Sequence, residues 1–290
     1  MIGSIESYLP SLFAGLTSSS SSSVSTNILN IIEGTSTSSS GGVSGGNPIT
    51  AMQEAEQNQT QDIATTAKQP AVQLAISQFT TAVQKATSVQ QLLANPTVMQ
   101  VLLTANGMAD QIGNTALATQ ALMSNLSDPN SLANVISDTR WQSVAATYQF
   151  QAQGLSVIQN PAVLQTIANG YAEVTWRQSL DATTPGLSDA LTFKSEASSI
   201  TSVDQILGDP VLRTVVTTAL GIPEQIAFQD LGAQEKAITT QLDISQFQNP
   251  SFVNSFTDRY LIAAGQVASS SASATPSLES LAVQAAGLIA

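Results

Sequence analysis

The sequence predicts an all-α fold in which repeated helix-turn-helix units pack into one helical body. The main observation is a repeat. Residues 88–112 (SVQQLLANPTVMQVLLTANGMADQI) and 202–226 (SVDQILGDPVLRTVVTTALGIPEQI) align without a gap at an offset of 114 (202 − 88). Both copies carry the start and stop signals of helices, and the alternation of apolar and polar residues that is typical of strands is not seen. Internal repeats of this kind describe stacked helices.

Each copy is expected to begin with a short helix. Ser88 with Gln91, and Ser202 with Gln205, have the spacing of a capping box, in which the serine oxygen and the glutamine side chain each accept a backbone N–H. The short helix is expected to end before an Asx-Pro pair, because proline lacks an N–H and moves the preceding residue out of the α region.

A longer helix should follow in each copy, with the Asx side chain as its cap and proline at its first position. An apolar stripe predicts one buried face, and Gly107 and Gly221 are predicted to end the helix in the left-handed conformation. The face consists of Val98, Val101, Leu102 and Ala105 in the first copy and of Leu212, Val215, Val216 and Ala219 in the second.

Six of the eleven prolines follow Asn or Asp, and each such pair is predicted to start a helix, with a simple turn as the alternative. Aligning Pro129 with Pro250, at an offset of 121 (250 − 129), extends the repeat to residues 88–136 and 202–257. The second copy then contains about seven extra residues near FQDLGAQ. The six pairs are Asn47-Pro48, Asn95-Pro96, Asp128-Pro129, Asn160-Pro161, Asp209-Pro210 and Asn249-Pro250.

Composition divides the chain into a helical body, linkers and two apolar ends. A Ser/Gly-rich arm and a Ser/Ala-rich stretch hold too few apolar side chains to offset the entropy of ordering them, so we expect flexible linkers there, disordered in the case of the arm. The last residues can form a short amphipathic helix that begins at Thr275-Pro276. The expected order is an apolar segment at 1–16, a disordered linker at 17–47, an all-α body at 48–263, a linker at 264–276 and a C-terminal helix at 277–290.

The composition argues against several classes of function. The net charge is −12 and the eight basic residues are scattered, so no nucleic-acid-binding surface is expected. No apolar run approaches the roughly 20 residues that cross a bilayer, so no transmembrane segment is expected. The chain has no His and no Cys, and we expect no catalytic residue, metal or cofactor. A hydrolase that uses carboxylates alone remains an alternative, which a buried pair with raised pKa values would support.

Aromatic residues gather in the middle of the chain. Trp141, Val144, Ala145 and Tyr148 share one face of a predicted helix, which favours packing in the core. A partner-binding groove is the alternative, and the apolar side of the predicted C-terminal helix is a second candidate contact. The candidate partner-binding residues are Trp141, Tyr148, Phe150, Trp176, Leu278, Leu281 and Leu288.

Several motifs follow one another in a fixed order between about Thr87 and Ala263, and the most specific are Pro210-Val211-Leu212-Arg213 and Ala219-Leu220-Gly221-Ile222-Pro223. Together they resemble a bacterial family, domain-of-unknown-function family 1217, found mainly in alphaproteobacteria. The chain departs from the family pattern at three places. It has Tyr148-Gln149-Phe150 in place of Phe-Gly-Phe, Trp176-Arg177 in place of Phe-Glu, and Arg259-Tyr260-Leu261 in place of Arg-Phe-Leu.

The resemblance implies no catalytic residues, and members of this family often lie in flagellar gene clusters. We therefore expect a non-enzymatic structural or assembly protein associated with the bacterial flagellum. Its partners would be other proteins, either flagellar components or a second copy of itself. The Ser-rich arm suits flagellar type III export, which needs an unfolded leader. The alternative is a cytoplasmic helical adaptor or chaperone-like module that binds through a groove near Trp141 and Trp176.

Overall fold

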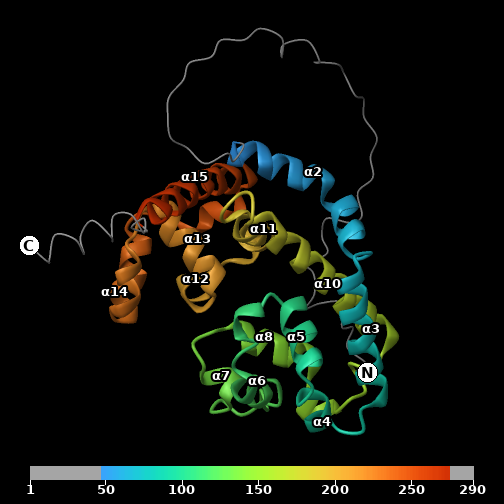
Figure 1. Ribbon diagram of the computed structural model, residues 1–290. Helices are drawn as coiled ribbons and strands as arrows, with labels where there is room; N and C mark the ends of the chain where they lie inside the picture. Colours follow the sequence, from blue (N-terminus) through green and yellow to red (C-terminus); the bar gives the residue numbers. More distant parts are fainter. Residues whose placement is uncertain (1–46, 275–290) are drawn as a thin grey trace, which may run out of the picture.

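The computed structural model describes residues 47–274, and every regular element in that range is a helix, which confirms the predicted all-α fold (Figure 1). The helices form two lobes, each with its own hydrophobic core. The first lobe lies at the bottom of Figure 1 and the second lobe at the top. The predicted segments 1–16 and 277–290, and residues 17–46 of the predicted linker, lie outside the described residues.

The first lobe encloses the first copy of the repeat. In its core α5 packs against α3 and α10. Gly170 of α10 permits a close approach, because an added Cβ would lie 2.9 Å from the carbonyl oxygen of Ala105. The elements of this lobe are α3 (Pro70–Lys85), α4 (Val89–Leu93), α5 (Pro96–Ala105), η2 (Ala109–Gln111), α6 (Thr115–Leu122), α7 (Leu132–Val135), α8 (Arg140–Tyr148), α9 (Phe150–Gln153) and the first part of α10 (Pro161–Leu180).

The second lobe encloses the second copy, with α13 packed against α11 and α15. Phe193 and Phe247 meet edge to face in its core, with ring centroids 5.2 Å apart. Its elements are α2 (Pro48–Thr66), the end of α10, α11 (Leu187–Glu196), η3 (Ala197–Ser199), α12 (Val203–Gly208), α13 (Pro210–Leu220), η4 (Glu224–Phe228), α14 (Leu231–Thr239), η5 (Ile244–Gln248) and α15 (Pro250–Ala274).

Two helices connect the lobes. The long α10 places Ile167 and Tyr171 in the first core and Trp176 in the second. Helix α2 precedes the first lobe in sequence, yet Met52 and Ala55 belong to the second core. The first and last parts of the described chain therefore lie together in the second lobe, where α2 and α15 are neighbours (Figure 1).

Both copies of the repeat form the expected helix pairs, α4 with α5 and α12 with α13. The caps at the junctions match. Asn95 accepts hydrogen bonds from the N–H groups of residues 97 and 98, and Asp209 accepts them from residues 211 and 212. The capping box of Ser202 and Gln205 is complete, whereas Gln91 accepts the N–H of Thr87 in place of the N–H of Ser88.

The two longer helices also end alike. Gly107 has φ +71° and Gly221 has φ +67°, which is the left-handed conformation predicted for both. The N–H of Met108 donates to Leu103 O, and the N–H of Ile222 donates to Thr217 O, each at 2.8 Å. Both ends are therefore Schellman motifs at equivalent positions of the repeat. The predicted apolar faces of these helices are buried throughout.

Two further details of the sequence prediction are wrong. Five of the six Asx-Pro pairs start a helix, but Asp128-Pro129 lies in a turn. Asp128 accepts the N–H of Asn130 there, and the polar residues that follow compete for backbone hydrogen bonds, so the next helix begins only at Leu132. Pro129 is thus no counterpart of Pro250, which begins the long α15.

The second error is the linker predicted at 264–276, because α15 continues to Ala274. Alanine has the highest helix propensity, and adding residues to an existing helix avoids the cost of nucleation. The hydroxyl of Ser269 donates to Gly265 O at 2.7 Å and that of Ser270 to Val267 O at 2.8 Å. These serines therefore bond within the helix, although their composition is typical of a linker.

Candidate functional site

The four aromatic candidates do not form a groove. Trp141, Tyr148 and Phe150 are buried in the first core, and Trp176 is buried in the second. The hypothesis of an aromatic binding surface is therefore wrong for these side chains, and core packing is their role. The remaining candidates Leu278, Leu281 and Leu288 lie outside the described residues.

Several polar side chains gather instead in a cleft between the lobes. This cleft has a volume of about 280 Å³ and is lined from both sides. The first lobe contributes the end of α5 and the start of α8, and the second contributes α11, α12 and the start of α13. Its polar lining residues include Asn106, Arg140, Ser143, Thr192, Glu196 and Asp209.

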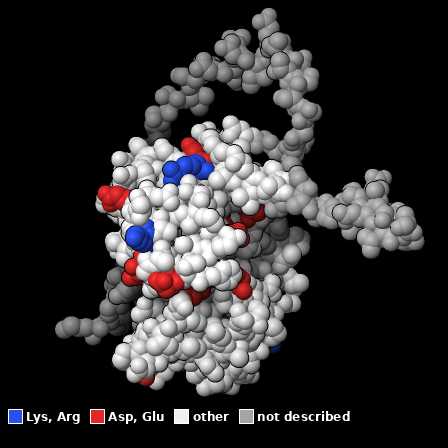
Figure 2. All heavy atoms as spheres, turned by 90° about the vertical axis from the view of Figure 1, so that its left-hand side faces the viewer, with Lys and Arg blue, Asp and Glu red and all other residues white. Residues whose placement is uncertain are grey.

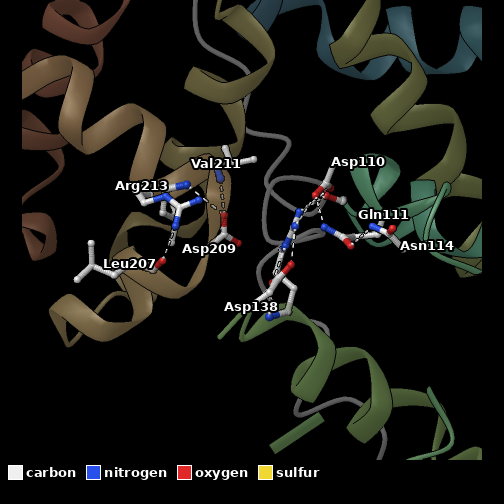
Figure 3. A network of polar contacts seen from close by, with 11 residues as sticks. Asp110, Gln111, Asn114, Asp138, Leu207, Asp209, Val211 and Arg213 are labelled. Atoms are coloured by element: carbon white, nitrogen blue, oxygen red, sulfur yellow. Dashed lines mark hydrogen bonds and ion pairs between the residues drawn. The ribbon is translucent and has the colours of Figure 1, made fainter. Parts of the chain in front are cut away.

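Arg140 is the centre of a charged network at one edge of this cleft. Its guanidinium donates to the carboxylate of Asp138 at 3.0 and 2.7 Å and to that of Asp110 at 3.0 and 2.9 Å. Figure 3 shows Asp110 and Asp138 reaching toward one another from separate segments of the first lobe. Arg140 also donates to Gly107 O at 2.9 Å, next to the Schellman motif.

These contacts keep the network ionised. Burial opposes the charge on Arg140, but its hydrogen bonds to Asp138 and Asp110 outweigh burial and raise its pKa. Burial also opposes the charge on Asp110, but the hydrogen bonds from Arg140 and Gln111 and the charge of Arg140 together outweigh it, so the pKa of Asp110 is lowered. A bidentate guanidinium between two carboxylates is a strong and directional contact, so it fixes the start of α8 against the end of α5.

A backbone hydrogen bond joins this network to the second lobe. The N–H of Thr139 donates to Gly208 O at 3.0 Å. The two segments are so close that a Cβ on Gly208 would lie 2.6 Å from Cγ2 of Thr139 and 3.1 Å from Ser137 O. A larger residue at this position would therefore force Thr139 or the backbone to shift.

On the second-lobe side, two acids have raised pKa values. Burial and the neighbouring charge of Asp209 raise the pKa of Glu196 to about 7. Burial also raises the pKa of Asp209, although the N–H groups of residues 211 and 212 oppose the shift. Figure 3 shows Asp209 at the start of α13 beside Val211. One Asp209 oxygen accepts both N–H groups, at 2.7 and 3.1 Å, so this carboxylate serves as a helix cap.

A buried ion pair lies on α10 between the lobes. Arg177 donates to Glu173 one helical turn earlier, and also to Thr192 Oγ1 of α11 at 3.1 Å. The Nε of Arg177 is buried and finds no hydrogen-bond partner within residues 47–274. The charge of Arg177 acts on Glu196 and lowers its pKa, against the larger effect of burial. The charged groups around the cleft thus form one electrostatic network that connects the two lobes.

Sequence reasoning missed this cleft because its members are far apart in the chain. Asp110 and Arg140 are 30 residues apart, and no periodic pattern connects them. The one local signal is Asp138 two residues before Arg140, which alone is typical of a solvated turn. Within the described part of the chain, no three acidic side chains gather as a metal site and no helix is long and apolar enough to cross a membrane.

Comparisons with known proteins agree with the motif resemblance. No curated protein matches the chain. A crystal structure of a protein from Agrobacterium tumefaciens is similar, with a TM-score of 0.63 and 23% sequence identity over 77% of this chain and 96% of that one. At this identity the likeness shows a shared fold. The family described as "Protein of unknown function (DUF1217)" matches residues 105–253, just over half of the chain. The chain therefore belongs to the DUF1217 family.

Proposed function

We propose that this protein is a non-enzymatic structural or assembly protein associated with the bacterial flagellum, and that it acts through protein–protein contacts. The observation that carries the proposal is an exposed apolar pair, Phe228 (89% exposed) and Leu231 (55% exposed). Both lie where the second copy of the repeat is longer than the first, between η4 and α14. A large aromatic side chain held in water is typical of a contact site.

Charged side chains are sparse over the chain, at 10% of its residues. Figure 2 shows one face of the molecule, on which most side chains are uncharged and the charged ones are scattered. The cores of protein interfaces are depleted of charged residues, so a sparsely charged surface is compatible with such a contact.

The cleft between the lobes supports a structural role. Arg140 bonds to two carboxylates and a carbonyl of its own lobe, and Asp209 caps α13. Asn95 holds the equivalent cap of the first copy, so the same task is done there by an uncharged side chain. A raised pKa such as that of Glu196 is also found in acid–base enzymes. The neighbouring carboxylate of Asp209, however, already accepts backbone hydrogen bonds as the cap of α13.

The flagellar setting and export rest on the family resemblance and on the Ser-rich N-terminal sequence. The alternative, a cytoplasmic adaptor or chaperone-like module, depends on a groove near Trp141 and Trp176. Both side chains are buried, which favours the assembly protein over that alternative.

Affinity capture from the native bacterium tests the proposal. The full chain is compared with the double variant Phe228→Ser/Leu231→Ser and with Val135→Ser, a control that changes another exposed apolar residue (60% exposed) in the first lobe. Flagellar rod, hook or export components should be enriched by the natural chain and by the control, and reduced with the double variant. Absence of flagellar proteins from all three samples would contradict the flagellar setting.

Export is tested separately. A secretion assay compares the full chain with a chain that lacks residues 1–46, in cells with and without a working flagellar export apparatus. The proposal expects export of the full chain alone, and only in cells with the apparatus. Retention of the full chain inside the cell would favour the cytoplasmic alternative.

A further inference from the structure

An apolar groove lies along the second half of α15, beside the start of α2. Its volume is about 590 Å³, and Pro48, Leu261, Ile262, Gly265, Gln266, Ser269 and Ser270 line it. Ile262 is 47% exposed, and a Cβ on Gly265 would meet nothing within 4 Å. The groove therefore offers an apolar side chain and an open glycine on one face of a long helix, where another helix could approach closely.

We propose that residues 277–290 of the same chain fold back antiparallel along α15 and occupy this groove. The described helix ends at Ala274, and Thr275-Pro276 follow directly. A loop of about 2–5 residues is enough to join two antiparallel helices, and proline is common just after a helix end. This proposal does not depend on the proposed function.

The length and pattern of the segment fit the groove. At a rise of 1.5 Å per residue, a helix over residues 277–290 is about 21 Å long, and the groove residues 261–270 span about 15 Å. Counting equal steps from a turn centred on Thr275 sets Leu281 near Ser269, Ala285 near Gly265 and Leu288 near Ile262. The small Ala285 thus lies beside Gly265, where two helices can come closest.

The short connection favours this occupant over the other candidates. A short helix is marginally stable alone in water, so the segment gains most from an apolar surface close at hand. A tether of two residues gives the groove a high effective concentration of this segment. Residues 1–16 would reach the groove only through the long segment 17–47, whose loop-closure entropy is greater. A segment supplied by a second copy of the chain would be present only at the concentration of the protein in solution, without the advantage of the tether.

Disulfide trapping tests the proposal, and the absence of cysteine from the sequence makes the experiment clean. The full-length double variant Ile262→Cys/Leu288→Cys should form a disulfide within one chain under mild oxidation. The control is Val267→Cys/Leu288→Cys, because Val267 does not line the groove and the helical period turns it to the opposite side of α15. This control pair should stay reduced.

Other outcomes overturn the proposal. A disulfide-linked dimer of the first pair would identify a second copy as the source of the segment. Equal trapping of both pairs would show that the tail has no fixed place. Hydrogen exchange gives an independent readout: deleting residues 277–290 should speed exchange of the backbone over 261–270 by about tenfold or more. Unchanged protection after the deletion would show that residues 277–290 do not cover the groove.

Discussion

The N–H of Thr139 donates to the carbonyl oxygen of Gly208, and this backbone hydrogen bond joins the two lobes. Thr139 precedes α8, and Gly208 is the last residue of α12. Their contact places the charged network of Arg140 in the first lobe against the cap of α13 in the second.

Replacing Gly208 should weaken this junction. In Gly208→Ala the new methyl group would lie 2.6 Å from Thr139 Cγ2, so the segments must separate. We expect a loss of about 1–3 kcal/mol in the free energy of unfolding, measured by chemical denaturation. Gly232→Ala in α14, whose Cβ would lie 3.4 Å from Oδ1 of Asp230, is the control. Equal stability of the two variants would show that the junction can relax.

Asp209 should be replaceable by asparagine but not by alanine. Asn95 performs the same capping at the equivalent position, and the raised pKa of Asp209 means that its charge is unfavourable in the fold. At neutral pH we expect Asp209→Asn to be as stable as the natural protein or more so, and Asp209→Ala to lose about 0.5–2 kcal/mol. Thermal unfolding of both variants measures the difference. A large loss in Asp209→Asn would assign the carboxylate a role beyond capping.

Gly221→Val should destabilise the protein by about 1–2 kcal/mol, because a β-branched residue is strained at positive φ. A Cβ at this position meets nothing within 4 Å, so the backbone conformation is the only cause. Gly113→Val is the control, since its surroundings are equally open and its φ is not positive. Matching melting temperatures for these two variants would refute the explanation.

Gln149 should be improved by glycine. It is the only non-glycine residue with positive φ within residues 47–274, at +44°, and the family pattern described above has glycine there. The left-handed conformation costs a residue with a side chain about 1–2 kcal/mol, and glycine avoids this cost. Glycine also loses more chain entropy on folding, which offsets part of the gain. Gln149→Gly should therefore raise the free energy of unfolding by about 0.5–1 kcal/mol. Gln149→Ala keeps the strain and should bring no gain. A gain in both variants would point to the loss of the side chain as the cause.

Stability should fall as pH rises through the range in which Glu196 titrates. Its pKa is about 7 in the folded protein, and about 4.3 is usual for an unfolded chain. Between these values the folded state binds more protons, so raising the pH favours unfolding. Asp189, with a pKa raised to about 6 by burial, acts in the same direction.

The variant Glu196→Gln should remove part of this pH dependence. Between pH 5 and pH 8 we expect it to lose about 1–3 kcal/mol less of its free energy of unfolding than the natural protein. This difference is smaller than for a fully desolvated carboxyl group, because Glu196 is half-buried. Denaturation curves across that range provide the measurement. Glu224→Gln, which changes an exposed acid outside the cleft, is the control. A slope that survives in Glu196→Gln would assign the effect to other acids.

Local signals predicted the helices well. Capping and the proline rule placed the starts at residues 96, 161, 210 and 250, because these effects act within a few residues of the chain. They failed at Asp128-Pro129, where polar residues after the proline keep the chain in a turn, and at 264–274, where composition suggested a linker.

The cleft could not be predicted in the same way. Arg140, Asp110 and Glu196 meet through tertiary packing of two lobes, and their spacing in sequence carries no period. The left-handed conformation of Gln149 was not predicted either, although the family pattern has glycine at that position. Burial of Trp141 followed from its helix face, and burial of Trp176 followed only from the position of α10 between the cores.

The place of α2 in the second lobe has a consequence for synthesis of the chain. Met52 and Ala55 leave the ribosome early, but their partners in the core extend to Leu261. The first core uses residues 72–172 and can close while translation continues, since domains generally fold from the N-terminus as they emerge. The second core cannot close until nearly the whole body has been made. Until then α2 carries an uncovered apolar face, and the nascent chain is most open to chaperones or premature contacts during that interval.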